Sequence, residues 1–299
     1  MNDFFASWAA RDLFDRDGSV SLRVISTHDH VMNLWAEEWG HMFMFADPEM
    51  YRGPASIGLR TKDFQALKNC VRPGDAAFFR DGRIEFYDKG VIKVSLSAAE
   101  RIFFSVPPNV EIHATSLEAA PVRIAMSELA APHLCSCLLA DGCGVVADPF
   151  VETMTSEFPY LIQSLAQGSQ QAFESAASAL VGLGCGSTPT GDDLIHGALI
   201  ALHYLKRTTC SDLPIPSMPR SIGTKTTLLG AHMLELGARG LTAEPVRDFA
   251  LNLLAGKSIE STFAGLRRMG SDSGCSIAVG LYLTMAEFLD SNAGKSSFT

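Results

Sequence analysis

A glycine-rich segment, residues 182–197, constrains the fold more tightly than any other part of the sequence. Its glycines at positions 182, 184 and 186 let the backbone adopt positive φ and bring bare N–H groups close to a ligand. Hydroxyl and carboxylate side chains come next: Ser187, Thr188, Thr190, Asp192 and Asp193. An apolar run over residues 198–205 follows. The pattern predicts a ligand-binding loop that leads directly into a helix, with Thr190 or Asp192 as its N-cap.

The chemistry of this loop favours a small anion. The first turn of a helix carries unpaired N–H groups and a partial positive charge, which suit a phosphate or a carboxylate. Because Asp192 and Asp193 repel an anion, we expect one of them to cap the helix or to position Mg²⁺, a proton or an amide. The loop lacks the lysine of a P-loop, and residues 170–180 look helical, unlike the strand of a dinucleotide-binding motif. The alternative is a structural connection in which Gly191 and Gly197 allow close helix packing.

A second loop of similar composition, residues 269–276, precedes the last expected helix. Its glycines at 274 and 280 repeat the spacing of the glycines at 191 and 197, and each pair follows a hydroxyl residue. The match is either chance or a structural repeat. A structural repeat would place two helix N-termini against one pocket.

Further polar residues lie between the two loops. Thr226 and Thr227 could bind the ligand or only cap a helix. Arg239 stands at the end of an expected helix, where it could cap carbonyl groups or bind a phosphate or carboxylate. His196 and His232 are expected to be half-buried helix residues, and either acts as a general base only if it reaches the pocket.

These observations define a candidate site. We predict catalytic roles for Asp192 and Asp193. The predicted ligand-binding residues are Gly184, Gly186, Ser187, Thr188, Thr190, Gly191, Thr226, Thr227, Arg239, Ser271, Ser273 and Gly274. No metal centre is expected and no cofactor is required, with Mg²⁺ at the paired carboxylates as the alternative.

Composition limits the partners and the compartment. The 299 residues carry a net charge of −9, which argues against nucleic acid or an anionic membrane as a partner. No apolar stretch reaches the ~18 residues of a membrane span, and residues 1–14 do not resemble a secretory signal. Seven cysteines, an odd number, indicate the reducing cytoplasm. Those at positions 135, 137 and 143 lack a standard zinc spacing, so we expect buried thiols.

The pattern changes from strands to helices along the chain. Short apolar segments between turn residues predict a meander over residues 76–79, 84–87 and 91–96, with further strands at 19–26 and 42–45. Helical periods follow from residue 148: 158–167, 170–183, 192–206, 226–237, 244–255, 258–269 and 276–289. We therefore expect an α+β protein. Its β-rich N-terminal domain (residues 1–147) would pack on an α-helical domain (residues 148–299) that carries both loops.

This combination of residues resembles a bacterial family, formerly of unknown function, that includes the AllH subunit assigned to oxamate carbamoyltransferase. The resemblance lies first in the segment Gly182-Leu183-Gly184-x-Gly186-x-Thr188-Pro189-x-Gly191-Asp192-Asp193, followed by Gly197. It extends to Thr226-Thr227, Ala238-Arg239-Gly240, Gly270, Ser273-Gly274, Gly280, Val24 and Asn33-Leu34. Cys185 and Ser187 stand where the family commonly has proline and leucine, as in a divergent member.

The resemblance implies carbamoyl transfer between carbamoyl phosphate and oxamate, in a complex with other subunits, during anaerobic purine or allantoin breakdown. In that reaction the phosphate would be bound by loop N–H groups and by Ser187, Thr188, Ser273 and Arg239. Asp192 or Asp193 would accept the proton of the attacking amide.

Two other functions fit the same residues. One is Mg²⁺-assisted phosphoryl transfer or nucleotide binding, with Asp192 and Asp193 as metal ligands. The other is a non-catalytic partner subunit whose β-rich half docks other chains. Each of the three candidate functions involves a small anionic ligand at the loops or membership of a larger complex.

Overall fold

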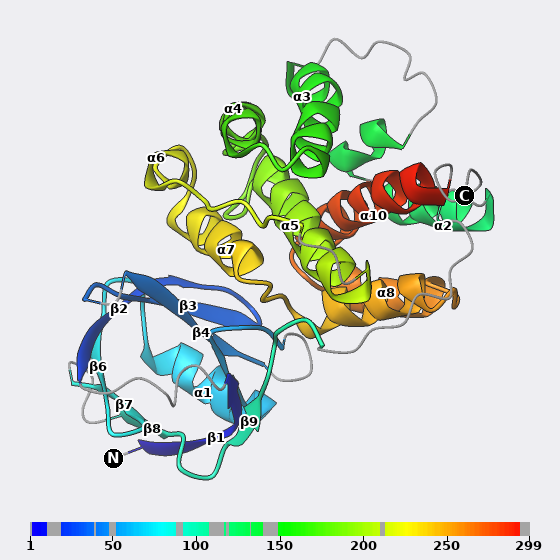
Figure 1. Cartoon of the computed structure of the whole chain (residues 1–299). Coiled ribbons are helices and arrows are strands. Elements are labelled where there is room, and N and C mark those ends of the chain that lie inside the picture. The colour runs from blue at the N-terminus through cyan, green and yellow to red at the C-terminus, as the bar shows by residue number, and fades with distance from the viewer. Residues whose placement is uncertain are drawn as a thin grey trace. The chain divides into compact units, whose positions relative to one another are not determined.

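The computed structural model describes residues 2–10, 19–38, 40–47, 52–87, 92–107, 117, 120–131, 133–139, 149–209 and 213–293. The chain divides into two compact units, Met1–Phe104 and Ser105–Thr299. Strands dominate the first unit and helices the second (Figure 1). This arrangement confirms the expected α+β fold class.

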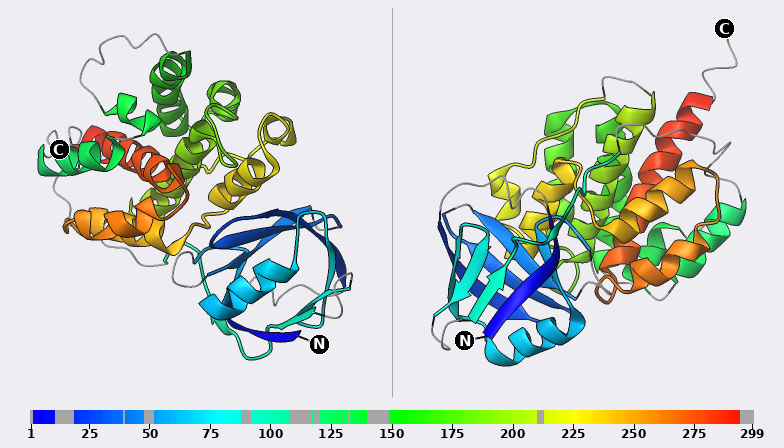
Figure 2. Two further views of the ribbon diagram at one scale, coloured as in Figure 1. Left: turned by 180° about the vertical axis from the view of Figure 1, so that it is seen from behind. Right: turned by 90° about the horizontal axis from the view of Figure 1, so that it is seen from below.

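One sheet runs through the first unit, in the order β5-β4-β3-β2-β6-β7-β8-β1-β9. Its strands are β1 (Asn2–Ala10), β2 (Val20–Thr27), β3 (Val31–Ala36), β4 (His41–Ala46), β5 (Ser56–Leu59), β6 (Ala76–Arg80), β7 (Arg83–Phe86), β8 (Ile92–Ser95) and β9 (Glu100–Ile102). An antiparallel pairing of β1 with β5 closes the sheet on itself, and Figure 2 shows the resulting curl. Helix α1 (Thr61–Cys70) buries Phe64 and Leu67 in the same core as the strands.

The expected meander is confirmed in β6, β7 and β8, which pair antiparallel in sequence order. In β6, Ala77 and Phe79 are buried, while Ala76, Phe78 and Arg80 are exposed. This alternation is the period of two that the sequence displays. Asp81 and Gly82 adopt positive φ, 50° and 67°, in the turn between β6 and β7. Such a turn suits the right-handed twist of a hairpin.

Helices build the second unit. They are α2 (Ala120–Ala130), the 3₁₀ helix η2 (Leu134–Leu138), α3 (Pro149–Ala166), α4 (Gln170–Leu180), α5 (Thr190–Thr209), α6 (Arg220–Gly223), α7 (Leu228–Ala238), α8 (Glu244–Leu254), α9 (Glu260–Arg267) and α10 (Ser273–Ala293). Helix α5 lies among α4, α7 and α10 (Figure 1), and residues 190–202 of it are all buried. None of the helices in the described stretches is long and apolar enough to cross a membrane.

The helical unit begins earlier than the boundary expected at residues 147/148. Helix α2 contacts α10, and η2 contacts α3. These contacts bury Met126, Leu129 and Cys135. The segment that the sequence assigned to the β-rich domain therefore contributes side chains to the helical core.

Candidate functional site

Helices α5 and α10 approach each other closely enough for their backbones to touch. A Cβ atom added at Gly197 would lie 2.1 Å from the carbonyl oxygen of Ile277, and one added at Gly280 would lie 2.2 Å from that of Leu194. Each helix therefore presents a glycine to the backbone of the other. The expected close packing at Gly197 is present, and Gly280 repeats it from the partner helix.

The connections into these two helices repeat the same geometry. Gly191 donates a backbone hydrogen bond to Leu183, and Gly274 donates one to Met269, at 2.9 and 3.2 Å. A Cβ atom at Gly191 would lie 1.9 Å from the carbonyl oxygen of Leu180; at Gly274 it would lie 2.1 Å from that of Leu266. The α4–loop–α5 and α9–loop–α10 segments are thus built alike, as the glycine spacing suggested.

The two loops meet at their hydroxyl groups. Thr188 Oγ1 lies 2.6 Å from Ser273 Oγ. Positive φ values at Gly182 (79°), Gly184 (110°), Gly186 (102°) and Gly270 (73°) shape both loops. The N-termini of α5 and α10 therefore lie side by side, and their partial positive charges act on the same space.

The first loop also offers backbone donors. Within the described part of the chain, no hydrogen bond from the N–H groups of residues 184–188 is formed. Cys185, Gly186 and Ser187 are exposed, and Thr188 is half-buried. A run of open N–H groups beside a helix N-terminus is suited to an anion.

Asp192 braces the loop. Its Oδ1 accepts a hydrogen bond from the Gly182 N–H at 2.8 Å, and its Oδ2 accepts one from the Thr226 hydroxyl. Burial raises the pKa of Asp192, and these two hydrogen bonds lower it in part. Gly230 makes room for the carboxylate, because a Cβ atom there would lie 2.1 Å from Oδ2. Asp192 thus ties the start of the loop to the segment before α7.

Asp193 has a different environment. Its side chain is 2% exposed, and its Oδ1 has no hydrogen-bond partner among the described residues. Burial raises the pKa of Asp193 well above its ordinary value; hydrogen bonds from Ser273 and Thr188 oppose the rise, while the nearby Asp192 and Asp272 carboxylates add to it. A buried carboxyl without a cation is favoured in its neutral form. Asp193 is therefore a buried acid whose carboxyl interacts with Ser273 and Thr188, the two residues at which the loops meet.

Helix α7 supports the first loop through its N-cap. The Thr227 hydroxyl donates to the carbonyl oxygen of Ser187 and accepts a hydrogen bond from the Gly230 N–H at 2.9 Å. The expected capping role of Thr227 is present. The Thr226 hydroxyl thus contacts Asp192, and the Thr227 hydroxyl contacts the loop itself. Both threonines therefore stabilise the conformation of the loop.

Of the other predicted site residues, Thr190 and Ser271 lie at the loops, whereas Arg239 does not. Thr190 is buried at the start of α5, where a Cβ atom at Gly184 would meet its backbone nitrogen at 2.9 Å. Ser271 is exposed and donates to Asp272. Arg239 is exposed at the C-cap of α7, the opposite end from Thr227. An eleven-residue helix spans about 16 Å, so the structure does not bring Arg239 to the loops.

The histidines and buried thiols lie outside this arrangement. His196 is fully buried, with Nδ1 2.7 Å from the carbonyl oxygen of Met233 and Nε2 3.2 Å from the Thr242 hydroxyl. Burial lowers its pKa to about 4, so it is neutral and joins α5 to α7. Burial also raises the pKa of Cys135 to about 12 and that of Cys275 to about 11. Cys135 and Cys137 are buried, as expected, and Cys143 lies outside the described residues.

Sequence reasoning missed two residues of the site. Gly230 provides the space for Asp192, and Asp272 contributes its charge to the surroundings of Asp193. Asp272 lies inside the second loop, so its position in the sequence could have revealed it. Gly230 carries no local signal, because its role depends on a carboxylate far away in the sequence.

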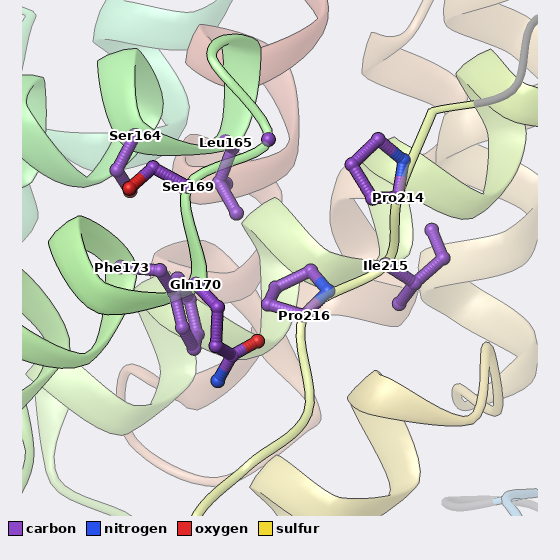
Figure 3. Close-up of a pocket in the computed structure, with 9 residues that line it drawn as sticks. Ser164, Leu165, Ser169, Gln170, Phe173, Pro214, Ile215 and Pro216 are labelled. Carbon is purple, nitrogen blue, oxygen red and sulfur yellow. The ribbon is translucent and has the colours of Figure 1, made fainter.

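A hollow elsewhere in the helical unit encloses about 80 Å³. Figure 3 shows the rings of Pro214 and Pro216 facing the junction of α3 and α4 across it. Gln170 fixes this segment through two hydrogen bonds with the backbone of Ser217, at 2.9 and 3.1 Å. None of the residues of the two loops lines this hollow, and ligand pockets are usually at least about 300 Å³. The loops therefore remain the candidate site.

Comparisons with known proteins agree with these features. A family model described as oxamate carbamoyltransferase subunit AllH matches residues 180–285, which include both loops. A second, described as the AllH family N-terminal domain, matches residues 2–101, which include the sheet. No curated protein and no solved structure matches the chain. Because the two family models match both structural units, the chain belongs to the AllH family.

Proposed function

We propose that this chain is a subunit of a carbamoyltransferase and that it binds carbamoyl phosphate where the two loops meet. The observation that carries the proposal is the 2.6 Å contact between Thr188 and Ser273, which joins two helix N-termini above a buried acid. The family description names an oxamate carbamoyltransferase subunit. Oxamate is therefore the proposed acceptor of the carbamoyl group.

The chemistry of the loops supports binding of the phosphate. Open N–H groups over residues 184–188 and the hydroxyls of Thr188 and Ser273 offer hydrogen-bond donors. Two helix N-termini add positive potential at the same place. Donors held by a rigid backbone stabilise the charge that develops on a leaving phosphate without reorganising.

Asp193 is the proposed hydrogen-bond donor on the phosphate side, and Asp192 the proposed positioning group. In the transfer, the amide nitrogen of oxamate forms a bond to the carbamoyl carbon, and the bond from that carbon to the phosphate oxygen breaks. The nitrogen loses a proton, which the departing phosphate can accept. A neutral Asp193 acts as a hydrogen-bond donor to the phosphate side through Ser273 and Thr188. This role fits its raised pKa better than the proton-acceptor role that the sequence suggested.

The remaining parts of the proposal concern partners, compartment and metal. We propose that other subunits of a carbamoyltransferase complete the active complex in the cytoplasm, during purine or allantoin breakdown. The proposal includes no cofactor, nucleic acid or membrane. Mg²⁺ stays the alternative, although both Asp192 oxygens already accept hydrogen bonds from protein donors, which compete with a cation.

The test is turnover of carbamoyl phosphate with oxamate in the reconstituted complex, comparing the wild type with Ser273→Ala and Thr188→Val. Loss of one transition-state donor reduces the rate by about 10²-fold, so we expect losses of that order. Arg239→Ala serves as a matched control, because it lies at the far end of α7 and should retain wild-type turnover.

Full turnover by both loop variants would contradict the proposed site. Activity of the complex without any dependence on the loops would favour a non-catalytic partner subunit. Calorimetric binding of ATP only with Mg²⁺, lost in Asp192→Asn, would favour the phosphoryl-transfer alternative.

A further inference from the structure

The outer face of the sheet carries exposed apolar side chains. Phe78 of β6 and Tyr87, just after β7, are 42% and 52% exposed, and their rings meet edge to face at 5.7 Å. Ile25, on an outward-facing position of β2, is 38% exposed. Helix α1 buries Phe64 and Leu67 against the opposite, inner face. Large apolar side chains gathered on an exposed face are typical of an interaction site.

Basic side chains surround the aromatic pair. The outward-facing positions of β2, β6, β7 and β8 include four cations and one carboxylate: Arg23, Arg80, Arg83, Lys93 and Glu85. Lys93 and Glu85 form an ion pair at 3.1 Å. The chain as a whole has a net charge of −9. The charge on these strands is therefore opposite in sign to that of the whole chain.

Two of these arginines directly oppose each other. Arg80 and Arg83 are cross-strand partners beside the β6–β7 turn, where Cβ atoms lie about 5 Å apart and like charges are destabilising. Arg80 approaches Asp81 at 3.4 Å and Arg23 approaches Glu37 at 4.0 Å, both in highly exposed pairs that stabilise little. Arg83 forms no ion pair with any residue that the structure describes. An external carboxylate would relieve this repulsion.

The combination fits an acidic protein surface. Aromatic residues and arginine are enriched at the centres of protein interfaces, and a polar rim surrounds them. Complementary charge selects the partner and speeds the encounter. A nucleic acid fits less well, because its phosphates would also approach the rest of a chain with a net charge of −9.

We propose that the outer face of β2, β6, β7 and β8 docks an acidic surface of another subunit of the carbamoyltransferase complex. Phe78 and Tyr87 fill the centre of the contact, and Arg80 and Arg83 pair with carboxylates of that subunit. The inference rests on the proposed membership of a complex. It adds which surface of this chain makes the contact and which charge the partner presents.

Binding of the full chain to the purified other subunits tests the docking surface. Biolayer interferometry at low and high ionic strength gives the Kd and the association rate. Arg83→Glu converts the opposed arginines into a pair of opposite charges, so the variant should melt no lower than the wild type. We expect its Kd to rise at least about tenfold and its association rate to depend less on salt.

A second variant tests the aromatic centre. Phe78→Thr keeps a residue that favours strands and removes the exposed ring. Its Kd should rise by a similar factor, at least about tenfold, while the salt dependence of the association rate stays that of the wild type.

Lys62→Glu is the matched control for charge. It makes the same change as Arg83→Glu within the sheet unit, but Lys62 lies in the first turn of α1, which packs on the inner face. An acid in that turn suits the helix dipole, so the variant should fold and bind with the wild-type Kd. Ser273→Ala, which alters the second loop, should also bind with the wild-type Kd.

The outcomes separate this inference from the proposed function. Wild-type affinity in Arg83→Glu and Phe78→Thr would overturn the inference and leave the proposed function standing. An equal loss of affinity in Lys62→Glu would also overturn it, because net charge rather than this face would then govern binding. Binding of a labelled oligouridine, or self-association in sedimentation, that Arg83→Glu abolishes while the complex still assembles would assign the face to another partner. Failure of the wild type to bind the other subunits would overturn both.

Discussion

Asp192 and Asp193 are neighbours with the same side chain and different tasks. Successive helix residues point about 100° apart, so the two carboxyls face different segments. Asp192 faces Gly182 and Thr226, which both donate to it. Asp193 faces the hydroxyls of the two loops and keeps one oxygen without a partner among described residues. The two neighbouring carboxyl groups therefore differ in role: Asp192 holds the loop in place through hydrogen bonds, and Asp193 is a buried acid.

Replacing Gly230 should disturb the hydrogen bonds that Asp192 accepts from Gly182 and Thr226. In Gly230→Ala, the new Cβ would lie 2.1 Å from Asp192 Oδ2 and 2.6 Å from Thr226 Oγ1. We expect a loss of about 1–3 kcal/mol in the free energy of unfolding, typical of overpacking, measured by urea denaturation. Gly223→Ala is the control, because its Cβ would come no closer than 3.5 Å to Ala231. Equal stability of the two variants would contradict a role for Gly230 in accommodating Asp192.

His196 should make the protein sensitive to acid. Its pKa is lowered to about 4 by burial, so the unfolded chain binds a proton at higher pH than the folded one. The stabilisation is complete above pH 6.5 and is lost as the pH falls toward 4, a change of about 3 kcal/mol. His196→Asn does not titrate, so its free energy of unfolding should fall less over this range. Parallel pH profiles of wild type and variant would contradict this.

At the scale of elements, two loop–helix segments with the same construction cross at Gly197 and Gly280. The expected segments agree with α4, α5, α7, α8, α9 and α10 within a few residues at each end. Their amphipathic or apolar periods are local and therefore readable from the sequence. The crossing brings both N-termini together, so that their partial positive charges act on the same space.

The crossing should not tolerate a methyl group. Alanine favours a helix over glycine by about 1 kcal/mol, but a Cβ at Gly197 or Gly280 would overlap a backbone carbonyl at 2.1 or 2.2 Å. We expect Gly197→Ala and Gly280→Ala each to lower the free energy of unfolding by about 3 kcal/mol. Urea denaturation measures the loss, with Gly223→Ala again as reference. A stability gain in either variant would show that the helices can separate at no cost.

At the scale of the whole molecule, the chain forms a closed sheet unit and a helical unit. Sequence patterns identified both classes of structure but assigned residues 105–147 to the β-rich part. Leu117 accepts a hydrogen bond from Tyr282 of α10 at 3.1 Å, and α2 and η2 contact α10 and α3. The helical core is therefore incomplete without this segment.

Truncation tests that assignment. A fragment of residues 105–299 retains α2 and η2, whereas a fragment of residues 148–299 loses the buried side chains of Met126, Leu129 and Cys135. We expect the longer fragment to unfold cooperatively and the shorter one to melt at a lower temperature, because burying each large apolar side chain contributes about 1.5–3 kcal/mol. Circular dichroism during heating measures both. A shorter fragment as stable as the longer one would restore the boundary at 147/148.

The sequence by itself determined the loop conformation, the helical periods and the hairpin turn. Glycine at 182, 184 and 186 permits positive φ whatever the neighbours, and periods of two or 3.6 residues are visible over short stretches. The repeated spacing that ends at Gly197 and Gly280 also lies in the sequence, although its meaning depends on the crossing.

Only the tertiary structure decided which residues share the site. Asp193 is buried and Arg239 lies at the far end of α7 because helices from distant parts of the chain pack together. Strand β1 closes the sheet by pairing with β5, a partner that no local pattern names. Burial, charge environment and long-range pairing arise from contacts between residues far apart in sequence, so local propensity does not contain them.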